Sequence, residues 1–306
     1  MSFSLIEIDP VHRIYSGHFS SFPEDIAVHG VSCRRGGVSK SPWDSLDLGL
    51  HVGDDPADVA ENRRRYLAAL GLDASQLVTP EQVHGEAIQR VGRSDAGRGA
   101  LSYADSIAKT DALITDEPGL PLLLCFADCT PILLLDPAHR AVGIAHGGWK
   151  GTVRRIAAKT VLRMQREFGT RPENVLAAIG PSIGPCCYEV GPEVERQFQE
   201  AFSGHEAALF SHPDAAGEPL GGQPPAARGD WRPAGAYRRG AHLHGLPPRG
   251  FLLLSRRWRP DGASRRRHRS AQLIGAPANG IILFFFYTSY QYKRGKSHDC
   301  RKSPSS

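Results

Sequence analysis

Apolar residues in the first two hundred positions fall into two kinds of pattern. Short continuous apolar runs predict strands buried between layers, and they lie at 76–83, 111–115, 120–126, 131–135, 141–145 and 175–179. Runs with apolar residues three or four positions apart predict helices, and they lie at 56–71, 152–168 and 192–202. The alternation of the two patterns predicts a mixed α/β layer protein.

The length and composition of the chain are typical of a globular protein. The sequence has 306 residues, of which 41% are hydrophobic and 23% are charged, so it can bury a sizeable core. Six cysteines show no spacing typical of a disulfide framework, and no signal peptide is evident, so we expect a cytoplasmic protein. The apolar run at 281–287 is much shorter than the ~20 residues that a membrane-spanning helix needs.

Positive charge is concentrated near the end of the chain. The formal net charge is +5, and eight arginines but only one acidic residue lie within 249–269. Such a block can bind nucleic acid or an anionic membrane, although it is more often a solvated stretch. No nucleic-acid motif accompanies it, so a nucleic-acid-binding module remains only a minor alternative.

Three segments share one design, in which a predicted strand ends in a turn that carries a metal-ligand residue type. These residues are His84, Cys129 and His146. Two imidazoles and a thiolate suit zinc, and three protein ligands leave a fourth position open for water or substrate, as in catalytic sites. Each residue taken singly is more often structural, and sequence spacing alone does not prove that the three turns meet.

Several motifs in a fixed order resemble the YfiH-like family, whose members are described variously as purine nucleoside phosphorylases, peptidoglycan editing factors and "laccase domain" polyphenol oxidoreductases. The resemblance covers roughly residues 30–200 and rests on Arg34-Arg35-Gly36-Gly37-Val38-Ser39, Asn62-Arg63, Gln82-Val83-His84-Gly85, Asp111-Ala112-Leu113-Ile114-Thr115, Ala127-Asp128-Cys129-Thr130-Pro131, His146-Gly147-Gly148-Trp149-Lys150-Gly151 and Ile179-Gly180-Pro181-Ser182-Ile183-Gly184. It implies an α+β fold, a single compact domain with mixed β-sheets flanked by helices. It also implies that His84, Cys129 and His146 hold zinc.

The same resemblance implies action on purine nucleosides, namely phosphorolysis of adenosine, inosine and methylthioadenosine, and deamination of adenosine. Zinc-activated water could attack C6 of adenine. Phosphorolysis instead needs cationic side chains that bind phosphate. The candidates are Arg34, Arg63 and Lys150, and each of them could instead be an ordinary charged residue on the surface.

Three further residues are candidates for substrate binding or catalysis. Asp128, next to the Cys129 ligand, could orient a histidine ligand or act as an acid/base, with turn capping as the alternative. Ser39 could donate to phosphate or ribose, or only stabilise its turn. Trp149 is a candidate for stacking on the purine.

Two rival enzymes remain open. A copper polyphenol oxidase is less favoured, because the only methionines, Met1 and Met164, lie far from the ligand motifs. A Cys/His hydrolase that edits peptidoglycan precursors would use Cys129 as nucleophile and His146 as base.

The C-terminal third departs from the family pattern. The family's Cys-Thr pair is absent there, and the arginine- and proline-rich texture of 219–269 suits out-of-frame reading of a GC-rich gene. We therefore expect a catalytic domain over 1–275 in which 219–269 is frameshifted or poorly ordered, followed by a tail over 276–306.

Overall fold

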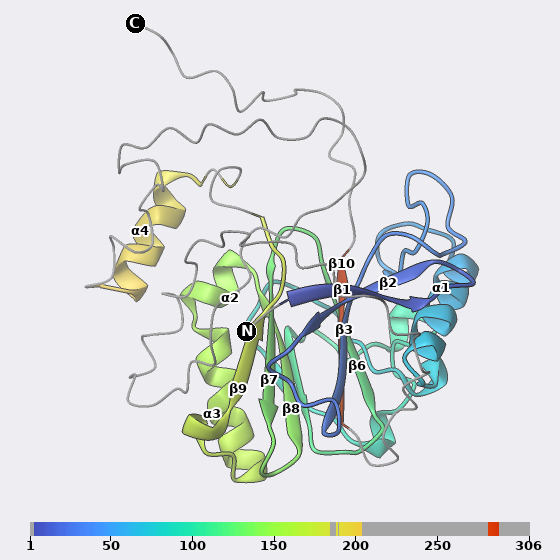
Figure 1. Cartoon of the computed structure of the whole chain (residues 1–306). Helices are drawn as coiled ribbons and strands as arrows, with labels where there is room; N and C mark the ends of the chain where they lie inside the picture. Colours follow the sequence, from blue (N-terminus) through green and yellow to red (C-terminus); the bar gives the residue numbers. More distant parts are fainter. Residues whose placement is uncertain (1–2, 184–187, 189, 204–280, 288–306) are drawn as a thin grey trace, which may run out of the picture.

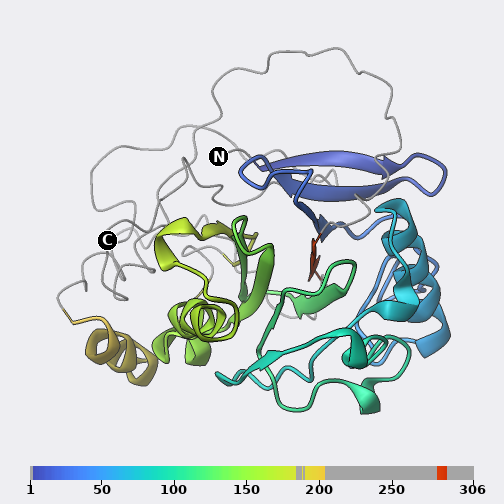
Figure 2. The same ribbon diagram turned by 90° about the horizontal axis from the view of Figure 1, so that it is seen from below.

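Two five-stranded sheets pack face to face and are flanked by helices in the computed structural model, which describes residues 3–183, 188, 190–203 and 281–287 (Figures 1 and 2). The first sheet has the order β1 (Phe3–Asp9), β2 (Ile14–Phe19), β3 (Ala27–Ser32), β10 (Ile281–Tyr287), β6 (Pro121–Phe126). The second has the order β4 (Ile88–Arg90), β5 (Ala112–Thr115), β8 (Ala141–Gly147), β7 (Thr130–Asp136), β9 (Leu176–Ile179).

Both sheets are mixed. In the first, β1, β2 and β3 pair antiparallel, whereas β10 runs parallel to both β3 and β6. In the second, β5, β8, β7 and β9 pair antiparallel, whereas β4 is parallel to β5. The predicted α+β fold with mixed sheets flanked by helices is confirmed.

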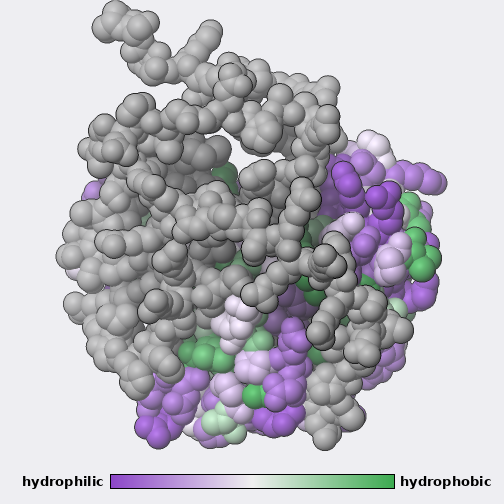
Figure 3. All heavy atoms as spheres, viewed as in Figure 1, coloured by the Kyte–Doolittle hydropathy of each residue, from purple (hydrophilic) through white to green (hydrophobic). Residues whose placement is uncertain are grey.

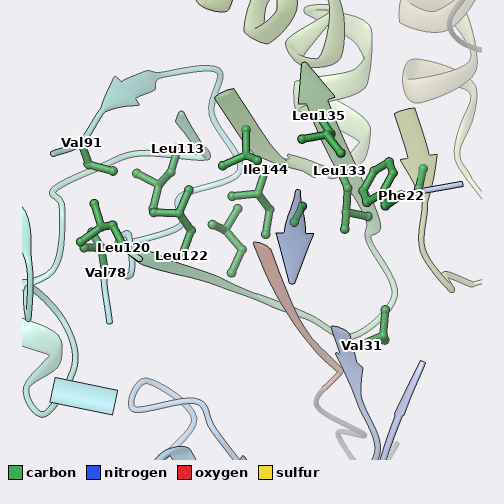
Figure 4. Close-up of a cluster of buried hydrophobic side chains, with 14 of the residues drawn as sticks. Phe22, Val31, Val78, Val91, Leu113, Leu120, Leu122, Leu133, Leu135 and Ile144 are labelled. Carbon is green, nitrogen blue, oxygen red and sulfur yellow. The ribbon is translucent and has the colours of Figure 1, made fainter. Parts of the chain in front are cut away.

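The continuous apolar strands are explained by burial on both faces. Along β6, Leu122 and Leu124 point into the core between the sheets, while Leu123 packs toward α1 (Pro56–Ala69). Figure 4 shows Leu122, Leu113 of β5 and other members of the core between the sheets. On the opposite side, the outer face of the second sheet packs against α3 (Ile156–Phe168). Because strand side chains alternate in direction, each of these strands must be apolar throughout.

Helix α1 forms as its sequence predicts. The Asp55 side chain accepts a hydrogen bond from the Ala57 N–H, and Pro56 occupies the first turn, where its missing N–H costs nothing. The helix ends before Gly71, which has φ of 76°. Inside the helix, Asn62 is fully buried and binds the loop over 38–47.

Two predicted elements are wrong in detail. Residues 76–83 form no ladder strand, because only single bridges join Val78 to Leu122 and Pro80 to Ile107, and proline cannot donate to a ladder. The helix expected over 152–168 is broken into α2 (Trp149–Val153) and α3, since Arg155 adopts a left-handed φ of 62°. The last predicted helix is confirmed as α4 (Pro192–Ala201).

The C-terminal residues are described only in part. The segment 219–269, for which we expected a frameshift, lies outside the described residues. Within the expected tail, 281–287 instead forms β10 between β3 and β6. Its run of branched and aromatic residues is typical of a strand.

On the face drawn in Figure 3, the described residues that grey atoms leave visible are mainly hydrophilic, with scattered hydrophobic side chains. Across the described residues, no helix has the length and apolar character needed to cross a bilayer.

Candidate metal site

Three ligand-type side chains converge at one end of the second sheet. The ligand atoms offered by His84, Cys129 and His146 all lie within 4.8 Å of one another, and they are the one such group within the described residues. The two imidazole rings are 4.6 Å apart between centroids and nearly perpendicular. The expectation that three distant turns meet is therefore confirmed in geometry.

Strand register produces this convergence. Pairing of β7 with β8 places Thr130 opposite Gly147, so Cys129, just before β7, lies beside Gly148. His146 belongs to β8 itself and not to a turn after it, which corrects the sequence-based placement. His84 lies in a turn with a left-handed φ of 57°.

A fully buried carboxylate, Asp111, connects two of the ligands. Its Oδ1 accepts from the backbone N–H of His84 at 2.9 Å and from Nδ1 of His146 at 2.8 Å. Its Oδ2 accepts from the N–H groups of Gly85 at 2.7 Å and Val83 at 3.3 Å. Because Nδ1 of His146 is thus engaged, Nε2 is the nitrogen left to face a metal ion.

Asp111 takes the orienting role that was one of the alternatives for Asp128. Asp128 is exposed, and its backbone oxygen accepts from the N–H of Ile183 at 3.0 Å. Within the part of the chain that the structure describes, no hydrogen bond joins the Asp128 side chain to a histidine ligand. The available sequence signal for Asp111 was its position immediately before an apolar strand that is predicted to be buried. Charged residues are rarely buried without partners, so an aspartate there is expected to have some.

Gly148 keeps space open beside the ligands. A Cβ atom at this position would lie 3.1 Å from Cδ2 of His84 and 3.3 Å from Sγ of Cys129. A larger residue would therefore push at least one ligand side chain aside.

Electrostatics favour a metal over a free thiolate. Burial, together with the nearby Asp128 and Asp111, raises the pKa of Cys129 to about 11. Burial also lowers the pKa of His84, and the neighbouring His146 and Lys150 act in the same direction. For Asp111, burial pulls its pKa upward, but hydrogen bonds from His146 and Gly85 outweigh it, so the pKa lies below its usual value. A neutral imidazole and a thiol that needs a cation to ionise are the states from which metal binding starts.

Four of the five predicted substrate-binding residues divide into two groups, and the fifth, Arg63, is buried and donates to backbone carbonyls. Lys150 and Trp149 begin α2 directly after the site, with the Lys150 ammonium 5.6 Å from the Trp149 ring centroid. Arg34 forms an ion pair with Asp44 at 3.0 Å, and the buried Ser39 accepts from Asn62 at 2.7 Å. Among the described residues, no hydrogen bond or ion pair joins Arg34 or Ser39 to the three ligands.

Sequence reasoning also missed Gln82. Its side-chain amide pairs with the backbone of Cys125, donating to the carbonyl at 2.8 Å and accepting from the N–H at 2.7 Å. This pairing ties the segment that carries His84 to β6.

Comparisons with known proteins identify the family to which this chain belongs. The family model described as "Multi-copper polyphenol oxidoreductase laccase" matches residues 28–228, more than half of the chain. The chain belongs to this family. Similar proteins carry names other than that of the family model. "Purine nucleoside phosphorylase YlmD" of Geobacillus stearothermophilus is 48% identical to this chain over 55% of this chain and 61% of its own length. "Purine nucleoside phosphorylase YfiH" of Escherichia coli is 40% identical over 60% of this chain and 70% of its own length.

A solved structure of the family supports the fold. The crystal structure of the Bacillus licheniformis hypothetical protein YfiH matches with a TM-score of 0.57 and 36% sequence identity, over 67% of this chain and 72% of that chain. The chain spans about three fifths of the length of the two YlmD proteins that it matches at 48% and 40% identity. The expected YfiH-like relationship is confirmed.

Proposed function

We propose that this protein is a zinc-dependent purine nucleoside phosphorylase that cleaves adenosine, inosine and methylthioadenosine with phosphate, and that it also deaminates adenosine. The observation that carries the proposal is the convergence of His84, Cys129 and His146 within 4.8 Å. The names of the relatives supply the reaction class, since YlmD and YfiH are named purine nucleoside phosphorylases. We further propose that it acts in the cytoplasm.

The donor set fits zinc. Two imidazole nitrogens and one sulfur at mutual distances within 4.8 Å match a three-ligand site that keeps a fourth position open. When bound, zinc would supply Lewis-acid chemistry by polarising an oxygen and making water a better nucleophile at neutral pH. Copper is less favoured, because the described residues hold one such group, whereas multicopper chemistry needs several metal ions.

The protein's own residues would bind and orient the substrate. Asp111 holds the His146 ring so that Nε2 faces the ligand group, and it fixes the backbone around His84. Lys150 and Trp149, next to the site, would contact phosphate and stack on the purine. Asp128, exposed beside Cys129, would act as the acid/base in this proposal.

The hypothesis of a Cys/His hydrolase is weakened by the burial of Cys129. Burial raises the pKa of the Cys129 thiol to about 11, so without a bound cation very little thiolate is present at neutral pH. A stoichiometric zinc ion would in addition occupy the sulfur.

The deciding experiment measures phosphate-dependent release of hypoxanthine or adenine from nucleosides, together with the metal content of the purified protein. Cys129→Ala is expected to lose both zinc and base release. Cys33→Ala, which also removes a free thiol, is the matched control and is expected to keep both. Equal rates for wild type and Cys129→Ala would reject the proposal, and ammonia release from adenosine without phosphate tests the deaminase separately.

A further inference from the structure

A small cavity is lined in part by Gln82, two residues before the metal ligand His84. It has a volume of about 10 Å³ and is lined by Leu50, His51, Arg63, Thr79, Pro80, Gln82, Tyr103, Leu123 and Cys125. The His51 ring stacks on the Tyr103 ring, with centroids 5.6 Å apart. The cavity is therefore lined in part by the segment that carries the metal ligand His84.

Arg63 is the unusual residue in this wall. Its side chain is only 3% exposed, yet within the described residues no carboxylate lies close enough to form an ion pair with it. A buried charge without a counter-ion costs several kcal/mol, so such groups are normally paired. An anionic ligand is one way to supply the missing partner.

The hydrogen bonds of Arg63 leave one donor group for such a ligand. Nε donates to the Leu48 carbonyl at 2.8 Å, and Nη1 donates to the carbonyls of Gly99 at 2.6 Å and Ala100 at 2.8 Å. No hydrogen bond from Nη2 to any described residue is found. The three carbonyls hold the guanidinium in one orientation, so Nη2 is a preorganised donor at the cavity wall.

Asp47, whose charge acts on Arg63, offers only partial compensation. Asp47 is 5% exposed, and its Oδ2 has no hydrogen-bond partner among the described residues. Burial raises the pKa of Asp47 to about 7, with Asp54 acting in the same direction and Arg63 opposing it. A carboxyl group that is partly protonated near neutral pH leaves positive charge in this region uncancelled.

We propose that this cavity is an anion subsite that takes one oxygen of inorganic phosphate, with Nη2 of Arg63 as its charged donor. The volume of about 10 Å³ is close to that needed for a single water-sized atom, so only one oxygen of the anion enters the cavity. This assignment rests on the proposed phosphorolysis, and it names Arg63 over Arg34, which is already paired with Asp44.

The test is calorimetric titration of inorganic phosphate into the full chain without nucleoside. Arg63→Gln is expected to weaken phosphate binding by about 10- to 100-fold, since a charge-assisted hydrogen bond is lost. Arg64→Gln removes an exposed neighbour on the same helix, which pairs with Glu61 at 2.7 Å, and is expected to change binding less than about twofold.

A second variant covers the case in which Arg63→Gln does not fold. Leu50→Phe enlarges a wall residue without removing a hydrogen bond, and it is expected to weaken phosphate binding at least about tenfold. Cys129→Ala separates this subsite from the metal, because phosphate binding in that background must still fall when Arg63→Gln is added.

Absence of phosphate binding by wild type overturns the proposal. So does unchanged binding in Leu50→Phe or in a folded Arg63→Gln, or loss of all Arg63 dependence in the Cys129→Ala background. Phosphate binding that depends on Arg63, without release of any purine base, would reject the proposed phosphorylase while leaving the anion subsite in place.

Discussion

Replacing Asp111 by asparagine tests whether one carboxylate organises the metal site. The side chain keeps its shape but carries a single acceptor oxygen in place of two. Four donors converge on the native carboxylate, three of them backbone N–H groups at 2.7, 2.9 and 3.3 Å and the fourth Nδ1 of His146 at 2.8 Å. In Asp111→Asn, two of these four donors must face an NH₂ group.

The magnitude follows from that count. A hydrogen bond to a charged group contributes about 1.5–3 kcal/mol, and part of the loss is recovered by relaxation, so we expect the free energy of unfolding of the metal-free protein to fall by about 3 kcal/mol. Loss of a partner that orients a ligand typically lowers metal affinity about 10- to 100-fold, or ~1.4–2.7 kcal/mol.

Two assays measure these quantities separately. Competition with a chromophoric chelator gives the zinc dissociation constant, and guanidinium unfolding of the metal-free protein gives stability. Asp116→Asn is the matched control, because Asp116 follows the same strand but is 41% exposed and pairs with Arg90 on the surface. We expect it to change stability by less than about 1 kcal/mol. Wild-type zinc affinity in Asp111→Asn would refute the reasoning.

Three other variants probe packing, protonation and loop order. Gly148→Ala places a Cβ 3.1 Å from a ligand ring and should lower zinc affinity about tenfold by chelator competition, while Gly92→Ala, with open space around it, should not. His29 is 2% exposed, and burial lowers its pKa from 6.5 to about 3, so the unfolded chain takes up the proton first and stability falls as pH drops below 6.5. Between pH 6.5 and about 5 this loss in the free energy of unfolding is ~1.6 kcal/mol in urea titrations, and His29→Gln should remove it. An unchanged pH profile would contradict the lowered pKa of His29. Asn62→Ala breaks four hydrogen bonds to the loop over 38–47 and should lower the free energy of unfolding by about 3–5 kcal/mol in denaturant titrations. The control is Gln76→Ala at an exposed position, which should lower it by less than ~1 kcal/mol. An equally small loss for Asn62→Ala would show that these hydrogen bonds do not order the loop.

Local sequence predicted β5, β6, β7, β8 and β9, but it did not predict β1, β2, β3, β4 or β10. Apolar runs fixed β5, β6, β7 and β8, because each of these strands is buried on both faces and admits few polar side chains. Caps and periodic apolar residues fixed α1. Sequence failed at Arg155, where a left-handed residue divides one helical pattern into α2 and α3, since its own residue type gives no warning of that conformation.

The ligand types were also readable from sequence, because few residues other than histidine and cysteine bind zinc from strand ends. What only the tertiary structure decided is how they meet. Register between β5, β8 and β7 brings Asp111 beside His146 and Cys129 beside Gly148, and hydrogen bonding between strands sets that register over long sequence separations. The environment of Arg63 was likewise decided by tertiary packing. Because α1 packs against the loops that carry the carbonyls of Leu48 and Gly99, this arginine is a buried cation without an ion-pair partner among the described residues.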